Sequence, residues 1–230
     1  EKRNTAYHEA GHAIIALMLA GTIDPIHKAT IIPRGRALGM VMTLPESDRY
    51  NWTYEKALAR LTMLFGGREA EIFKFGSKKV TNGAMGDIQM ATNLARAMIM
   101  EWGMSDRLGR VRYRSNEQEV FLGHSVSQST NMADETAKLI DEEVRHYIEE
   151  GEQNARRIIT ENNDKFVAIA EALLEFETLT GEELRGIMDG RPPVRDAFDD
   201  TAPPRGSAVP TTKPRPKGEE PDGATPQPTA

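Results

Sequence analysis

Two histidines, His8 and His12, flank a glutamate at position 9 near the start of the sequence. Residues 7–20 contain no proline and a single glycine, and alanine, leucine and methionine are frequent there, so the sequence predicts a helix. Side chains four positions apart lie on one face of a helix, so both imidazoles can point at one metal ion. Glu9 then lies beside His8, where its carboxylate can polarise a metal-bound water molecule. This zincin arrangement predicts a zinc hydrolase.

Composition limits the kind of metal site and the kind of partner. The sequence has 230 residues and no cysteine, which excludes thiolate ligands and disulfides. A metal held only by histidines and carboxylates suits catalytic zinc better than structural zinc. The formal net charge of −6 gives no support to nucleic-acid binding. We find no signal peptide and no membrane-spanning segment, because the longest apolar run, residues 13–20, is far too short. We expect a chain that is soluble as given and, because it begins so close to the motif, a fragment of something longer.

The elements that follow must position these residues. Two short strands are predicted in residues 23–33 and 37–44, and they form the only clear β region. A helix is predicted from Thr53, as its N-cap, to a stop at Gly76. The pair Gly66 and Gly67 inside this helix costs about 1 kcal/mol per residue relative to alanine. Close approach to another helix or to the active site would explain that cost.

Three more helical segments are predicted downstream, giving a mainly α-helical fold with a small β element near the active-site helix. The first covers residues 88–102, with Ile88 and Trp102 on its buried stripe, and the others cover residues 134–162 and 165–176. A terminal helical turn follows Thr180, and the irregular stretch 105–130 holds one short strand candidate at residues 110–113. Three further histidines are predicted to be structural or solvent-facing: His27, His124 and His146.

The last forty residues differ in composition from the rest. Ten of the thirteen prolines lie between Arg191 and Ala230, and Phe198 is the one aromatic residue there. Such a segment buries too little apolar surface to offset its ordering entropy. We therefore predict a metallopeptidase domain over residues 1–190 and a disordered proline-rich tail over residues 191–230.

A catalytic zinc ion needs a third protein ligand besides the two histidines. Ile15 and Met18 occupy the positions where metzincins carry glycine and a third histidine, so that subclass is excluded. Helix-borne carboxylates supply the remaining candidates. Glu69 and Glu71 lie on the helix that begins near Thr53, and Asp87 lies at the start of the next helix, where the helix amide end favours a charged carboxylate. The residue pattern alone does not choose among these three.

The sequence resembles the peptidase domain of the FtsH family, the membrane-anchored ATP-dependent AAA+ zinc proteases. The HEAGH motif at residues 8–12 is preceded by EK at 1–2 and AY at 6–7. Further segments agree with the family in order and spacing across residues 1–190: IPRG at 32–35, ALG at 37–39, LPE at 44–46, FGGR at 65–68, AE at 70–71, GA at 83–84, WGMS at 102–105, FLG at 121–123 and ETL at 177–179.

The resemblance implies the roles of the site residues. His8, His12 and Asp87 would be the ligands of one zinc ion per chain, and Glu9 would be the catalytic base. Glu71 matches an acidic family position near the site and is the second choice for a ligand, or a partner of one. The sequence departs from the family at two positions. Asn82 replaces a usual threonine in a loop that lines the cleft, and Ala133 replaces a frequent serine helix cap, which would cost about 1 kcal/mol.

The resemblance also implies a larger protein. FtsH-like proteins carry transmembrane helices and an AAA+ ATPase domain upstream, form homohexamers, and thread unfolded or misassembled membrane and soluble proteins into the peptidase chamber. The sequence contains no GxxxxGK[ST] phosphate-binding loop, so ATP would act only through that upstream domain. The implied location is the cytoplasmic side of a cell inner membrane, or its organellar equivalent, with the membrane reached through a segment upstream of this chain.

An extended substrate needs backbone partners, and the second predicted strand offers an edge for it. The residues expected to bind substrate there are Leu38, Gly39, Met40 and Val41. Two alternatives to a zinc endopeptidase are a non-catalytic hexamer-forming assembly module and a zinc hydrolase with a non-peptide substrate. Intact His8, Glu9, His12 and Asp87 favour the endopeptidase over the assembly module.

Overall fold

The computed structural model describes residues 1–35, 38–45, 51–113, 132–191 and 193. In chain order its elements are α1 (Lys2–Met18), β1 (Ile26–Thr30), β2 (Met40–Thr43), α2 (Tyr54–Phe75), η1 (Ser77–Lys79), η2 (Asn82–Ala84), α3 (Met85–Met100), α4 (Asp134–Glu161), α5 (Asn163–Phe176), β3 (Thr178–Thr180) and α6 (Gly181–Met188). The predicted class, mainly α-helical with a small β element, is confirmed.

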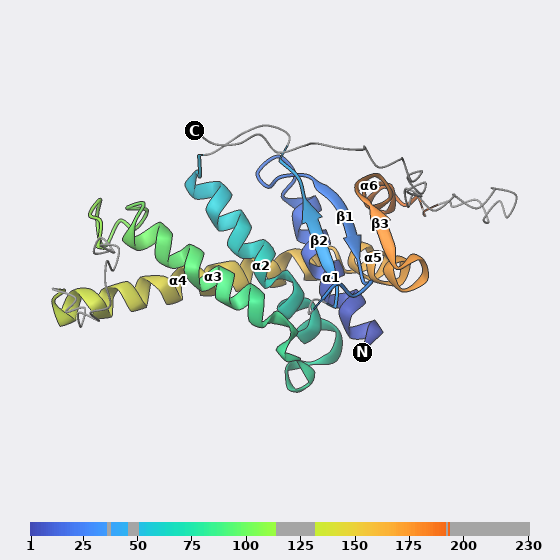
Figure 1. Cartoon of the computed structure of the whole chain (residues 1–230), viewed down its shortest axis with the longest axis horizontal. Helices are drawn as coiled ribbons and strands as arrows, with labels where there is room; N and C mark the ends of the chain where they lie inside the picture. The colour runs from blue at the N-terminus through green and yellow to red at the C-terminus, as the bar shows by residue number, and fades with distance from the viewer. Residues whose placement is uncertain (36–37, 46–50, 114–131, 192, 194–230) are drawn as a thin grey trace, which may run out of the picture. The chain divides into compact units, whose positions relative to one another are not determined.

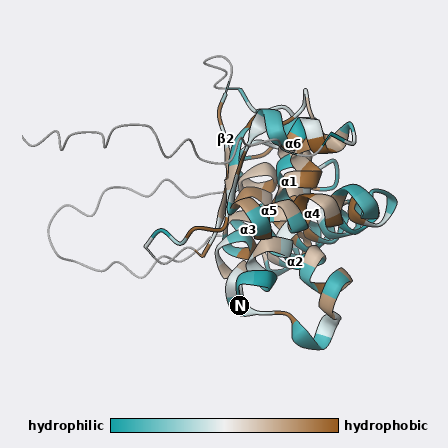
Figure 2. Cartoon of the chain, turned by 90° about the vertical axis from the view of Figure 1, so that its right-hand side faces the viewer, coloured by the Kyte–Doolittle hydropathy of each residue, from teal (hydrophilic) through white to brown (hydrophobic). Residues whose placement is uncertain are grey.

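The helix that carries the histidines lies at the centre of the fold. Every residue of α1 from Ala6 to Ala16 is buried, so this helix is packed on all sides. It contacts α2, α4 and α5, and the sheet packs on it through β1 and β2 (Figure 1). Brown and teal bands alternate along the ribbons in Figure 2, as expected of helices with one apolar face. The buried setting fixes the direction of side chains on α1.

The sheet has three antiparallel strands in the order β2-β1-β3. Thr30 lies opposite Met40 and Ile26 lies opposite Thr43, with a register shift between Ile26 and Lys28. β1 and β2 lie within the predicted strand regions. β3, opposite the same stretch of β1, was not predicted, so the expectation of a single β pair is wrong. Within the described residues β2 has one unpaired edge, and Figure 1 shows α2 on that side of it.

The helix α2 begins and ends where the sequence predicted. The hydroxyl of Thr53 accepts a hydrogen bond from the backbone N–H of Lys56 at 3.1 Å, and Gly76, at φ 87°, ends the helix. Both explanations offered for the double glycine hold at once. A Cβ on Gly66 would lie 2.7 Å from the backbone oxygen of Gly11 on α1, and one on Gly67 would collide with the imidazole of His8. The two glycines let α2 approach α1 and the site.

We expect Gly11→Ala to lower the free energy of unfolding by about 1–3 kcal/mol, because its Cβ would meet the carbonyl of Gly66 and force two backbones apart. The control is Gly86→Ala, which adds the same methyl group to a helical glycine with nothing within 4 Å. That variant should be neutral or more stable by up to about 1 kcal/mol. Urea denaturation measures both, and equal stability of the two variants would contradict the close contact.

The remaining elements correct several details. Residues 110–113 form no strand; Tyr113 instead donates its backbone N–H to Met100 at 2.9 Å and its hydroxyl to Leu108 at 2.9 Å. Ile88 and Trp102, expected on a buried stripe, are 43% and 38% exposed, and Trp102 lies beyond the end of α3. Two hydrogen bonds from Tyr113 thus tie the irregular connection to the end of α3 and to Leu108.

The N-termini of α4 and α6 can be compared with the sequence predictions for Ala133 and Thr180. Ala133 is the N-cap of α4 and supplies no side-chain hydrogen bond, as its departure from the family implied. The terminal turn after Thr180 is the helix α6, which opens with a capping box formed by Thr180 and Glu183. The predicted tail from position 194 onward and His124 lie outside the described residues. Among the described helices, none combines the length and apolarity needed to cross a membrane.

Candidate metal centre

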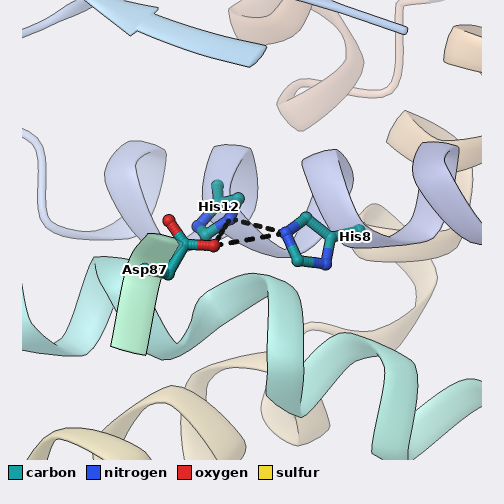
Figure 3. A group of neighbouring side chains, drawn as sticks. All are labelled: His8, His12 and Asp87. Atoms are coloured by element: carbon teal, nitrogen blue, oxygen red, sulfur yellow. Dashed lines mark hydrogen bonds and ion pairs between the residues drawn. The ribbon is translucent and has the colours of Figure 1, made fainter. Parts of the chain in front are cut away.

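His8 and His12 lie one turn apart on α1 and direct their imidazoles to the same place (Figure 3). Their Nε2 atoms are 3.2 Å apart, and both residues are buried, at 8% and 7% exposure. The helical spacing that predicted a shared direction for the two side chains is therefore borne out in the structure.

The third group comes from another helix, 75 positions along the chain from His12. Asp87 lies in the first turn of α3, and its Oδ2 atom is 3.4 Å from Nε2 of His8 and 3.5 Å from Nε2 of His12. One ligand atom from each of the three residues lies within 4.8 Å of the others, and the described residues hold no other such group of three. Figure 3 shows the three side chains pointing toward one another.

Hydrogen bonds on the far side of each ring fix which nitrogen faces this centre. Nδ1 of His12 is 2.8 Å from the backbone oxygen of Met63, which can only accept, so Nδ1 carries the proton. Nδ1 of His8 is 2.8 Å from Oε1 of Glu71. With each Nδ1 donating outward, each neutral ring presents a bare Nε2 lone pair to the centre.

Glu71 is itself held in place from the loop before α3. Its Oε2 accepts the backbone N–H of Thr81 at 2.7 Å, and its Oε1 is 3.2 Å from the Thr81 hydroxyl. Arg68 donates in turn to the backbone oxygen of Thr81 at 3.2 Å. Glu71 is therefore placed to orient His8, and its carboxylate points at Nδ1 rather than at the centre. Glu71 therefore faces Nδ1 of His8 and Asp87 faces Nε2, a difference in position that the residue pattern alone did not predict.

The donor set fits a zinc ion. Three ligands placed 2.0–2.1 Å from an ion at tetrahedral angles lie about 3.3–3.4 Å from one another. The three separations between the two Nε2 atoms and Oδ2 of Asp87 are 3.2, 3.4 and 3.5 Å. Two imidazole nitrogens and one carboxylate oxygen also match the ligand types of catalytic zinc. The fourth tetrahedral position has no protein ligand among the described residues.

In the absence of a metal ion, a protonated histidine can balance the negative charges of the carboxylates at the centre. Burial would lower the pKa of His8, but hydrogen bonds to Asp87 and Glu71 outweigh burial and raise it to about 9. Burial likewise opposes ionisation of Asp87, yet hydrogen bonds from His12 and His8 hold its pKa well below the usual range. Bonds from His8 and Thr81 also outweigh burial and lower the pKa of Glu71. The centre is built to bind a positive charge.

These pKa directions predict opposite pH dependences for the metal-free and zinc-loaded protein. The pKa of His8 rises from 6.5 to about 9 on folding, so the stability it contributes without metal is complete below pH 6.5 and is lost as pH rises through 9. Zinc instead needs neutral imidazoles, so its binding and the stability it adds increase over the same interval. Chemical denaturation at pH 6.5 and 8.5, with chelator and with zinc, measures both slopes. Slopes of the same sign would contradict the assignment of His8 as a zinc ligand that binds a proton when the metal is absent.

Glu9 lies on the same helix between the two histidines and is 6% exposed. Burial raises the pKa of Glu9, and the charges of His12 and His8 oppose that increase. Gly39, just before β2, packs directly on this carboxylate, since a Cβ there would lie 2.6 Å from Oε1. The beginning of the free-edged strand therefore touches the side chain predicted to be the base.

Other residues singled out in the sequence lie elsewhere or in adjoining positions. Glu69 points to α4, where its Oε2 accepts from Nε of Arg156 at 2.8 Å, so it is not part of the centre. His27 and His146 are exposed, in agreement with a surface role. The expected substrate-binding residues fall at the start of the edge strand: Leu38 and Gly39 precede β2, and Met40 and Val41 belong to it.

Sequence reasoning missed one residue that shapes the centre, Met63, and identified another, Gly67, without its contact. The carbonyl of Met63 orients His12, and no side-chain pattern announces a backbone acceptor. Gly67 makes room for the imidazole of His8. The double glycine in the sequence predicted a close contact at this position, but it did not identify the imidazole of His8 as the group in contact.

Residues 1–187 match the model of the family described as Peptidase family M41. The chain belongs to peptidase family M41. It is 54% identical over 196 residues to the ATP-dependent zinc metalloprotease FtsH of Caulobacter vibrioides, an alignment that covers 85% of this chain and 31% of that protein. It is 48% identical over 195 residues to FtsH 3 of Symbiobacterium thermophilum, covering 85% and 31%, and 47% identical over 191 residues to FtsH of Buchnera aphidicola, covering 83% and 31%.

Membership of M41 confirms the predicted enzyme class and the predicted cofactor: the chain is a zinc metallopeptidase domain. The family resemblance seen in the sequence motifs is also confirmed. The chain spans about a third of the length of the relatives it matches, 31% of each of the three named above. What those longer proteins do as wholes is therefore a separate question from the chemistry of this M41 domain.

Proposed function

We propose that residues 1–190 are the zinc endopeptidase domain of an ATP-dependent protease. His8, His12 and Asp87 would hold one zinc ion, and Glu9 would act as the base. The single observation that carries this proposal is the tetrahedral spacing of the three donor atoms, 3.2, 3.4 and 3.5 Å apart, in a chain of family M41.

The reaction needs a nucleophile, a proton acceptor and a polarised carbonyl. Bound at this centre, zinc would lower the pKa of a water molecule and polarise the scissile carbonyl. Glu9 accepts the proton of the attacking water and later delivers it to the leaving amine. Its raised pKa suits both steps, because a carboxylate that is easier to protonate accepts and holds a proton more readily.

Hydrogen bonds to the two histidines hold their rings in the orientation that metal binding needs. Met63 and Glu71 hold the two Nδ1 protons, so neither ring has to change tautomer when a cation arrives. Thr81 and Arg68 extend this support to the loop before α3, which carries Asp87. This support supplies a rigid donor set from two separate helices.

Substrate would add to the free edge of β2 as an extended strand. The binding positions are Leu38, Gly39, Met40 and Val41, with the backbone giving affinity and side-chain pockets giving selectivity. The contact of Gly39 with Glu9 favours this edge, because a chain paired there passes the proposed base.

The larger assembly is also a proposal. Relatives carry the name ATP-dependent zinc metalloprotease, and by analogy an ATPase domain outside this chain would deliver unfolded or misassembled polypeptides. We propose a homohexamer anchored through a segment upstream of this chain, with the peptidase domain on the cytoplasmic side of the inner membrane or its organellar equivalent.

The decisive test is metal removal and restoration. The zinc-loaded chain should cleave an unstructured fluorogenic peptide, lose that activity on dialysis with a chelator, and regain it with zinc but not magnesium. Unfolded casein should be cut slowly or not at all without the motor domain. Cleavage that persists in the metal-free protein would overturn the proposal.

A further inference from the structure

A cavity of about 230 Å³ lies at the far end of β2, away from the metal centre. It lies between the end of the edge strand, the chain entering β1 and the first turns of α2. Its lining residues are Ile23, Asp24, Thr43, Trp52, Lys56 and Arg60. None of these residues has a part in the metal centre or in the proposed chemistry.

One face of α2 connects the cavity to the metal centre. Lys56 and Arg60 lie four positions apart, and the same face continues through Met63 to Gly67. Met63 orients His12 through its carbonyl, and Gly67 packs against the other imidazole. Arg60 also contacts this support directly, since its Nη1 donates to Sδ of Met63 at 3.4 Å. The cavity therefore begins one helical turn from the residue that holds His12.

The strand β2 also runs from the metal centre to the cavity. Gly39 lies against Glu9, and Thr43, four residues further, lines the cavity. At about 3.3 Å per residue, a substrate paired along β2 travels about 13 Å between these points. A side chain three or four residues from the scissile bond would therefore reach the cavity.

Among the residues that the structure describes, one cation of the cavity has no partner carboxylate. Nζ of Lys56 is 3.1 Å from Oδ1 of Asp24 and lies 5.6 Å from the ring centre of Trp52. Arg60 makes no ion pair with any residue that the structure describes, and its guanidinium donates instead to the sulfur of Met63. The described lining residues comprise two cations, Lys56 and Arg60, and one anion, Asp24, so their net charge is positive. The Trp52 ring offers a flat wall for a methylene stem.

We propose that this cavity is a specificity site that binds an acidic side chain of the substrate, aspartate or glutamate, three or four residues from the scissile bond. Arg60 is the residue that recognises the carboxylate, through a charge-assisted hydrogen bond. This inference rests on the proposed function, because it assumes that substrate pairs with β2.

The test is a series of fluorogenic peptides that carry glutamate or glutamine at each position within five residues of the scissile bond. For the zinc-loaded chain, kcat/KM should favour glutamate about five- to tenfold at one position, on the side that pairs with Thr43. Arg60→Gln should bring that ratio to about one, and Arg60→Lys should retain most of it. Arg60→Glu should favour lysine there instead. A merely structural role of Arg60 would change all peptides alike.

Binding separates this proposal from the proposed function. Fluorescence anisotropy of labelled peptides with the zinc-loaded Glu9→Gln variant reports the cavity without any cleavage. A glutamate preference that depends on Arg60, in cleavage or in binding, supports the specificity site, even if no peptide bond is cut. Equal cleavage or binding of glutamate and glutamine peptides at every position overturns it while leaving the endopeptidase intact, and so does a preference that survives in Arg60→Gln.

Discussion

Replacing Glu9 by Gln is expected to abolish peptide cleavage, by about 10²–10⁴-fold in kcat, while zinc stays bound. The amide has nearly the shape of the carboxylate and fits against Gly39, but it cannot accept a proton from water. The metal ligands are untouched, because His8 and His12 direct their Nδ1 atoms to Glu71 and to the Met63 carbonyl, and neither donates to Glu9. The measurements are zinc content and single-turnover cleavage of a fluorogenic peptide.

The matched control for this variant is Glu69→Gln, which also removes a buried carboxylate. Glu69 is 3% exposed and pairs with Arg156, so the control should lose stability but keep its cleavage rate per zinc-bound molecule. Substantial cleavage by Glu9→Gln would remove Glu9 from the mechanism. An equal loss in both variants would mean that buried charge, and not proton transfer, had been measured.

Local signals in the sequence accounted for most of the helical framework. The N-cap at Thr53, the stop at Gly76 and the apolar periodicity gave α2 nearly to the residue. β3 has only three residues and pairs with β1 about 150 positions earlier, so no local pattern could reveal it. The stretch 110–113 alternated like a strand but found no partner strand, and single hydrogen bonds hold it instead.

The metal centre shows the same division between local and distant information. His8 and His12 share a helix, so their spacing alone predicted a common target. Glu69 and Glu71 are two positions apart on α2 and therefore point to different neighbours, Arg156 and His8 respectively. Spacing within α2 could not say which neighbour each would meet. That choice depends on how α1, α3 and α4 pack, which only family resemblance or the structure supplies.

The third ligand gives the second large expected effect. Asp87→Ala should weaken zinc binding by more than about 100-fold, because it removes one of three protein ligands and leaves the two Nε2 atoms without the anionic partner. Cleavage should be lost together with the metal, in contrast to Glu9→Gln. Competition with a chromogenic chelator measures the affinity, and the zinc-to-protein ratio after gel filtration measures retention.

Glu71→Gln is the variant that makes this result specific. Its amide oxygen can still accept the Nδ1 proton of His8, but the charge is gone, so zinc affinity should fall only about 10–100-fold. The order of loss, Asp87→Ala well beyond Glu71→Gln, follows from one carboxylate facing Nε2 and the other facing Nδ1. The reverse order, with zinc content unchanged in Asp87→Ala, would make Glu71 the ligand and require the two side chains to exchange roles when the metal binds.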